Sequence, residues 1–214
     1  MEIKYLGHSS FLIKNKEGKL ITDPFDPKFV GLKFSKQEAD IITISHSHKD
    51  HSFTGFVDGN PLILTWPGQF EKKGIRIWGF KTFHDKKQGA ERGENVLYKI
   101  ETEGVAILHC GDLGMIPTDE LIDEIGDVQV LMVPVGGKFT LDASEALEMV
   151  KKVDPAIVIP MHFGRPEMAI EGLAPVEEFT KKMGIETVEP LDKLVLKKED
   201  FVVDQAVRVV VLKS

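Results

Sequence analysis

Short, mostly apolar runs separated by polar turn residues occupy the first half of the chain. Gly, Asn and Asp mark many of the turns, as in NKEGK and ETEG, and this punctuation is typical of neighbouring β-strands. The pattern predicts strands at residues 2–6, 9–14, 19–23, 40–45, 61–65, 75–80, 96–101 and 105–110.

The second half alternates helical patterns with fully apolar runs. Helices are predicted at residues 118–125, 142–153 and 174–183, and the middle one begins with a capping-box arrangement of Asp142 and Glu145. The runs VQVLMVPV and AIVIP are apolar throughout, which is typical of strands buried on both faces under covering helices. The chain therefore predicts a mixed α/β layered domain with sheets inside and helices outside.

Nothing in the sequence marks an internal boundary. It has 214 residues, no repeat of fixed period and no low-complexity linker, so we expect a single domain over residues 1–214.

The stretch TISHSHKDHSF, residues 43–53, carries three of the seven histidines of the chain. It follows a predicted buried strand, and strand ends are where functional sites are usually built. His46 and His48 are two positions apart, so in an extended chain both imidazoles leave on one side and can bind one cation. Asp50 and His51 come just after and can face a second cation, in a segment, residues 50–56, that is expected to open a short helix. A polar loop with chance histidines is the simpler alternative, but three histidines so close together favour a metal site.

These residues also carry a family resemblance. SHSHKDH resembles the His-x-His-x-Asp-His signature of the metallo-β-lactamase superfamily, and KTFHD, HCGDLG and VIPMHFG follow in the order that this superfamily implies. With YLGHSSFLI and LITDPF, the resemblance spans residues 5–164. It is greatest to the small single-domain hydrolases that include ascorbate-6-phosphate lactonase-like and N-acylphosphatidylethanolamine phospholipase D-like proteins.

The resemblance implies a metallo-β-lactamase fold, an α/β structure in the form of a four-layer αβ/βα sandwich. It also implies two divalent metal ions. One would be bound by His46, His48 and His84, the other by Asp50, His51 and His162, and Asp112 would bridge them. Five imidazoles and two carboxylates without a thiolate suit zinc, with manganese or iron as alternatives.

Two such ions about 3.5 to 4 Å apart share a hydroxide that attacks at neutral pH while one ion polarises the scissile bond. We therefore expect a hydrolase of a small-molecule ester, lactone or phosphodiester. The alternative is a non-hydrolytic metal-binding or sensing protein with the same ligands.

Other polar residues allow more than one interpretation. Asp50 and His8 are the candidate catalytic residues, His8 as a proton donor or substrate contact, although a structural histidine fits that position equally. Asp23 is expected either to accept a hydrogen bond from a metal-binding histidine or to form a simple turn before Pro24. His109 and Asp112 are three apart, so strand alternation predicts that His109 faces away from the metals, unless the turn at Gly111 breaks the alternation.

Charge and composition narrow the range of partners. The chain has 27 basic and 34 acidic residues and a net charge of -7, with dispersed lysines, so no nucleic-acid partner is expected. No apolar run approaches the ~20 residues of a membrane-spanning helix, and the start lacks the pattern of a secretory signal. The single cysteine, Cys110, cannot form an internal disulfide. These features predict a cytoplasmic protein with a small-molecule substrate, and they give no indication of oligomeric state.

Overall fold

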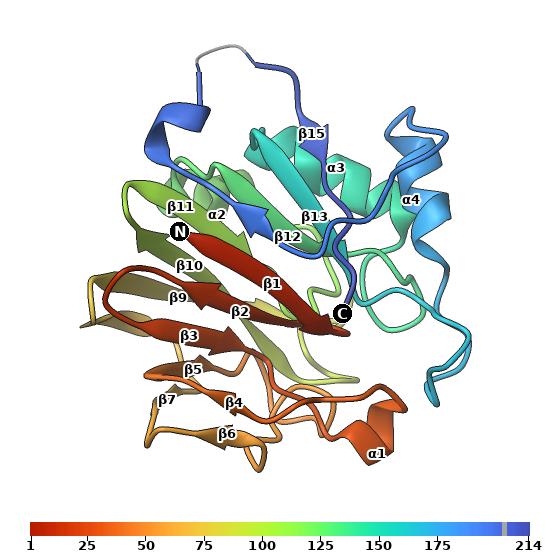
Figure 1. Ribbon diagram of the computed structural model, residues 1–214. Coiled ribbons are helices and arrows are strands. Elements are labelled where there is room, and N and C mark those ends of the chain that lie inside the picture. Colours follow the sequence, from red (N-terminus) through yellow and green to blue (C-terminus); the bar gives the residue numbers. More distant parts are fainter. Residues whose placement is uncertain (203–204) are drawn as a thin grey trace.

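Two large β-sheets pack face to face in the computed structural model, which describes residues 1–202 and 205–214 (Figure 1). The first has the order β14-β1-β2-β3-β5-β7 and the second the order β15-β13-β12-β11-β10-β9-β8. The strands of the first sheet are β1 (Glu2–Gly7), β2 (Ser10–Lys14), β3 (Lys19–Thr22), β5 (Ile41–Thr43), β7 (Leu62–Leu64) and β14 (Leu194–Val195). Those of the second are β8 (Gly68–Lys72), β9 (Ile75–Phe83), β10 (Glu94–Thr102), β11 (Val105–His109), β12 (Val130–Pro134), β13 (Ile157–Met161) and β15 (Arg208–Val209).

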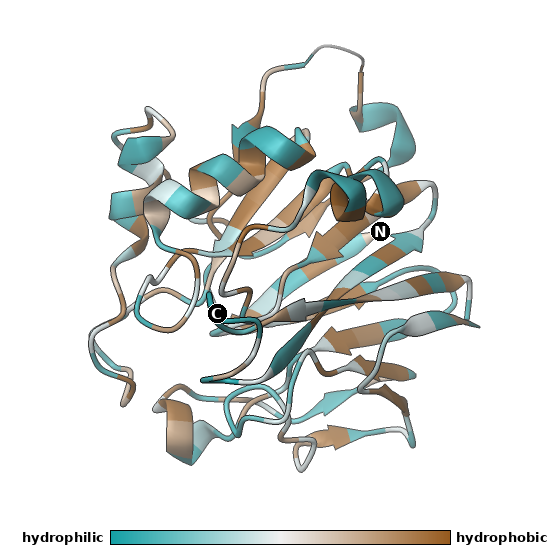
Figure 2. Ribbon diagram, turned by 180° about the vertical axis from the view of Figure 1, so that it is seen from behind, coloured by the Kyte–Doolittle hydropathy of each residue, from teal (hydrophilic) through white to brown (hydrophobic). Residues whose placement is uncertain are grey.

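The helices are distributed unequally over the two sheets. Helices α2 (Asp119–Ile125), α3 (Ala143–Val153) and α4 (Val176–Lys182) cover the outer face of the second sheet, with their hydrophilic sides outward (Figure 2). The first sheet is accompanied by the one-turn α1 (Pro27–Val30) and by a small pair of strands, β4 (Gln37–Glu38) and β6 (Val57–Asp58). A 3₁₀ turn, η1 (Lys198–Asp200), lies near the C-terminus. In the part of the chain that the structure describes, no helix has both the length and the apolar character needed to cross a membrane.

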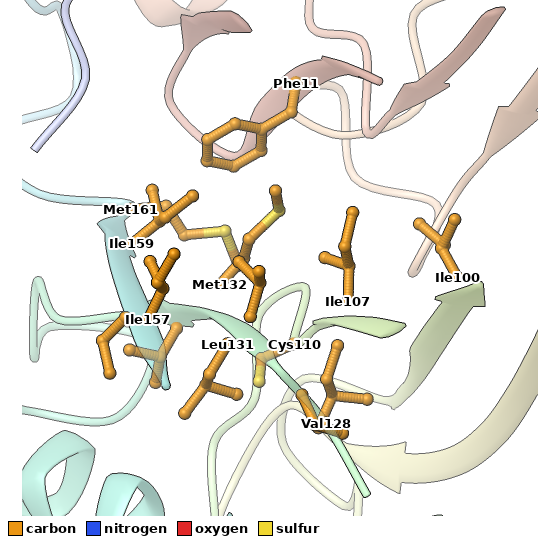
Figure 3. Close-up of a cluster of buried hydrophobic side chains, with 14 of the residues drawn as sticks. Phe11, Ile100, Ile107, Cys110, Val128, Leu131, Met132, Ile157, Ile159 and Met161 are labelled. Carbon is orange, nitrogen blue, oxygen red and sulfur yellow. The ribbon is translucent and has the colours of Figure 1, made fainter. Parts of the chain in front are cut away.

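The main core lies between the sheets. Phe11 of β2 points across the sandwich toward Met132 and Met161 (Figure 3). The neighbouring Leu131 points to the opposite face of β12, which explains why this strand is apolar at every position. Burying each of these large side chains stabilises the fold by roughly 1.5–3 kcal/mol.

The strand directions place the candidate site residues at one edge of each sheet. β9 is antiparallel to β10, and β10 to β11, while β11, β12 and β13 are parallel, so the C-terminal ends of β9, β11 and β13 lie at the same edge. The same reasoning places the ends of β1, β3 and β5 together at one edge of the first sheet. All seven predicted metal ligands follow the ends of these strands, as does His8.

One local prediction is wrong. Residues 50–56 form no helix but turns and irregular chain. His51 N–H donates to the His48 carbonyl, and Phe53 N–H donates to the carbonyl of Pro24, so the segment is held by a distant loop instead of by its own helical hydrogen bonds.

Candidate metal centre

The structure brings the three histidines predicted for the first ion together. Nε2 of His46 lies 3.0 Å from Nδ1 of His48, and the ring of His84 lies 4.7 Å and 5.1 Å from those two rings between centroids. His46 and His48 are in a bent segment instead of an extended strand, yet their nitrogens still face one point.

The residues predicted for the second ion also converge, and His8 joins them. Ligand atoms of His8, Asp50, His51 and His162 all lie within 4.8 Å of one another. His8 comes from the turn between β1 and β2, more than 40 positions before Asp50. The resemblance did not place it in either ligand set.

Asp112 lies between the two groups. Its Oδ2 is 3.2 Å from Nε2 of His84 and 3.3 Å from Nε2 of His162, which belong to different groups. Its Oδ1 is 3.1 Å from Nε2 of His51. A side chain in this position has the geometry of a bridging ligand.

Asp23 and Ser45 orient two of the rings. The Asp23 carboxylate accepts hydrogen bonds from Nδ1 of His51 (2.8 Å) and from the Ser45 hydroxyl (2.6 Å), and its other oxygen accepts from the Ser45 backbone N–H. Ser45 Oγ in turn lies 3.0 Å from Nδ1 of His46. Asp23 therefore accepts a hydrogen bond from a predicted metal ligand, as in the first of the two roles considered for it. The role of Ser45 was missed, although a serine directly before His46 at the end of a predicted buried strand was a signal.

Asn95 positions Asp112. This buried side chain accepts a hydrogen bond from the Asp112 backbone N–H and donates to Thr82 and to the Cys110 carbonyl, tying β9, β10 and the end of β11 together. Sequence reasoning missed Asn95, and the available signal was an amide directly before the apolar run Val96–Tyr98.

Two glycines let the ligand-bearing segments approach closely. A Cβ at Gly114 would lie 2.3 Å from the carbonyl carbon of His84, and one at Gly136 would lie 2.1 Å from the carbonyl oxygen of His162. Any side chain at these positions would displace the backbone that carries a predicted ligand.

His109 lies outside this cluster. Its Nε2 donates to the Ser9 carbonyl at 2.8 Å, and its ring packs edge-on against Phe11 between the sheets. His109 therefore lies outside the predicted ligand set, as expected. The reason is not strand alternation, because β11 ends at His109 and Gly111 turns the chain with a φ of 54°.

The charges of the site suit a cation. Burial lowers the pKa of His46 to about 3 and that of His8 to about 4, with further lowering by neighbouring histidines, so both rings are neutral and offer lone pairs. Although burial raises the pKa of Asp112, the adjacent His162 and His51 hold it well below its usual range. For His51, burial alone would lower the pKa, but the Asp112 and Asp23 carboxylates hold it well above its ordinary value. These carboxylates favour a positive charge at Nε2 of His51, and a metal ion bound there would replace the proton.

The residues fit divalent metal ions. Nε2 of His51, Nε2 of His162 and Oδ1 of Asp112 are buried and have no hydrogen-bond partner among the described residues, and each such atom costs about 1–3 kcal/mol. Two ligands of one tetrahedral ion with bonds of about 2.0–2.3 Å lie about 3.3–3.8 Å apart. The donor separations of 3.0–3.8 Å in the cluster are close to that range.

Known proteins that are similar in sequence include metal-dependent hydrolases. The family model of the β-lactamase superfamily domain matches residues 2–162. A UPF0173 metal-dependent hydrolase from Thermococcus onnurineus (strain NA1) is 32% identical over 86% of this chain and 92% of its own length.

Solved structures share the whole fold. A Thermotoga maritima protein of the metallo-β-lactamase superfamily, suggested to be a Zn-dependent hydrolase, superposes with a TM-score of 0.79 at 32% identity and covers 99% of both chains. Igni18, a metallo hydrolase from Ignicoccus hospitalis KIN4/I, has a TM-score of 0.68 at 21% identity and covers 92% of this chain and 99% of its own. These matches confirm the metallo-β-lactamase fold predicted from the sequence.

Proposed function

Because the chain belongs to the metallo-β-lactamase superfamily, and within it to the UPF0173 family of metal-dependent hydrolases, we propose that it hydrolyses a small-molecule ester, lactone or phosphodiester at two divalent ions. The observation that carries this proposal is the position of Asp112, whose Oδ2 lies 3.2 Å from His84 and 3.3 Å from His162. One carboxylate between two sets of imidazoles supports a site with two ions, because the carboxylate can be shared by both.

The first ion would be held by His46, His48 and His84, and the second by Asp50, His51 and His162, with Asp112 shared. Zinc is the first candidate, and manganese or iron are the alternatives. When bound, such a pair lowers the pKa of a shared water and polarises the bond to be cleaved.

Asp50 is the residue we assign to proton transfer. Its carboxylate is partly exposed, unlike that of Asp112, so it lies at the boundary between the buried cluster and solvent. Burial raises its pKa, but the hydrogen bond with His8 and the nearby His51 ring hold the pKa well below its usual range. An ionised carboxylate in this position accepts a proton from the attacking water and returns it to the leaving group.

Two of the proposed ligands are accessible to solvent. His48 is exposed and Asp50 is half-buried, whereas His51, His84 and His162 are fully buried. Exposure of one ligand from each set supports access of solvent and substrate, and it argues against a closed site that only stores or senses metal. The sequence resemblance to lactonase-like and phospholipase D-like proteins makes lactones and phosphodiesters the first compounds to test.

A substrate screen of the metal-loaded protein tests the proposal. Chromogenic esters, lactones and phosphodiesters should include at least one class that is turned over, and chelator should abolish that turnover. Asp112→Ala should lose it as well, whereas the exposed Asp127→Ala should not. Binding of two ions without turnover of any class would favour the sensing alternative, and turnover that persists in chelator would refute metal dependence.

A further inference from the structure

His8 is held in an unusual backbone conformation. Its φ is 56°, in the left-handed region, which costs a residue with a side chain roughly 1–2 kcal/mol. Two hydrogen bonds to its carbonyl hold it there, one of 2.7 Å from the Tyr5 hydroxyl and one of 2.9 Å from the His162 backbone N–H. Strain that the surrounding structure maintains is often found where a side chain must be aimed at a functional site.

The conformation directs the imidazole into the cluster. Nε2 of His8 lies 3.2 Å from Oδ2 of Asp50, and its ring centroid lies 4.2 Å from that of His162 and 5.1 Å from that of His51. The side chain is completely buried. His8 is therefore enclosed by the three residues assigned to the second ion.

A hydrogen bond to Asp50 explains only part of this arrangement. The same Oδ2 of Asp50 lies 3.7 Å from Nε2 of His51, so the oxygen faces a point that several imidazoles share. Nε2 of His162 is buried there without a hydrogen-bond partner among the described residues. A hydrogen bond between His8 and Asp50 involves only two of the four side chains that meet here. Three imidazoles and one carboxylate around one point form an ordinary metal-ligand set.

We propose that His8 is an eighth protein ligand, which binds the second ion together with Asp50, His51 and His162. This inference rests on the two-ion site proposed above and assigns His8 to the metal in place of substrate or proton transfer. With the shared Asp112 and one solvent ligand, the second ion would have six ligands and the first five. Since zinc in proteins is usually bound by four ligands and sometimes by five, this assignment favours manganese or iron for the second ion and leaves zinc as the first candidate for the first ion only.

Metal titration of His8 variants tests the assignment. His8→Gly suits the left-handed backbone and leaves room for free imidazole, and His8→Asn also tolerates that conformation. Both should bind the first ion normally and the second more weakly, by more than the roughly 10–100-fold that loss of an outer hydrogen-bond partner causes. The matched control is His109→Asn, a buried histidine outside the cluster, which should keep both ions.

Cobalt substitution provides a readout independent of activity. The visible absorption of cobalt is weak with six ligands and stronger with fewer, so the band of the second ion should change in His8→Gly. Added imidazole should restore both the spectrum and the affinity. Circular dichroism verifies that the variants are folded. If His8→Gly does not fold, the metal affinity is measured on His8→Asn instead.

The outcomes separate the two proposals. A second ion that binds both variants with wild-type affinity and an unchanged spectrum would overturn the role of His8, even if hydrolysis is found. A selective and imidazole-reversible loss of the second ion would establish His8 as a ligand, even if no substrate class is turned over.

Discussion

Oδ2 of Asp23 lies 2.8 Å from Nδ1 of His51 and also accepts the hydroxyl of Ser45, which contacts the ring of His46. One buried carboxylate thus orients one proposed ligand of each ion. Asp23 itself has a φ of 37°, so its backbone is also strained where it enters the site. We expect this relationship to couple the affinities of the two ions.

Asp23→Asn should weaken the binding of both ions, each by roughly 10–100-fold. The amide group would oppose the N–H of His51 and the Ser45 hydroxyl if it replaced Oδ2, or the Ser45 backbone N–H if it replaced Oδ1. Competition with a chromophoric chelator measures both affinities. Asp127→Asn, an exposed change of the same chemistry, should leave them unaltered, and equal affinities in the two variants would contradict the coupling.

Ser45→Ala should act on one ion only. It removes the hydroxyl between Asp23 and His46 but leaves the hydrogen bond from His51 to Asp23. The first ion should therefore dissociate more readily while the second retains its affinity. Ser47→Ala is the matched control because Ser47 is exposed two positions away. A uniform loss at both sites would indicate a general loss of structure.

Metal removal should destabilise the fold. Without ions, the buried atoms of His51, His162 and Asp112 have no partners among the described residues. Ligands that bind only the native state stabilise it, by about 2.7 kcal/mol per site at a 100-fold excess over Kd. Calorimetry should show a Tm that rises with free metal concentration, and a smaller rise in Asp112→Ala. A Tm that does not respond to metal or chelator would count against the site.

Gly114→Ala should disturb the site through the backbone. The new Cβ would lie 2.3 Å from the carbonyl carbon of His84, a contact that neither side can relieve by a rotamer change. Gly184→Ala provides a reference, because that position has φ of 76° but no atom within 4 Å of the Cβ. We expect Gly114→Ala to lower both Tm and the affinity of the first ion, and Gly184→Ala to lower Tm only. Similar metal affinities in the two variants would show that the backbone at His84 shifts to accommodate the new methyl group.

Sequence reasoning located the long strands, the three main helices and the convergence of the ligands. It succeeded because the apolar runs are continuous and each motif directly follows a strand, so sheet direction determines where the side chains meet. β8 was missed because GQFEK alternates between intermediate and exposed positions and has a single large apolar residue. The two-residue strands β4, β6 and β14 pair with segments distant in the sequence and leave no local pattern.

The residues that support the site were harder to find. Asn95 holds Asp112 across 17 positions of sequence, and His8 reaches Asp50 across 42. Such contacts depend on how the two sheets are packed and have no fixed spacing along the chain. The only sequence signal for His8 and Asn95 was a polar residue next to a predicted apolar strand.

His84 and His109 are both buried, but only His84 contacts the proposed metal ligands. Nε2 of His84 lies 3.2 Å from Oδ2 of Asp112, whereas Nε2 of His109 donates to the Ser9 carbonyl, and its ring packs against Phe11. His84→Ala should therefore lose the first ion and activity together. His109→Ala should retain both ions but lose about 2–4 kcal/mol of stability, because it creates a cavity and leaves a buried carbonyl without its donor.

Elemental analysis after gel filtration measures the metal content of the two variants, and denaturant unfolding measures their stability. His109→Gln should recover part of the lost stability, because its amide can donate toward Ser9, and His84→Gln should not restore the metal. Comparable metal loss in His84→Ala and His109→Ala, or loss only in His109→Ala, would mean that the first ion is held by a different set of residues.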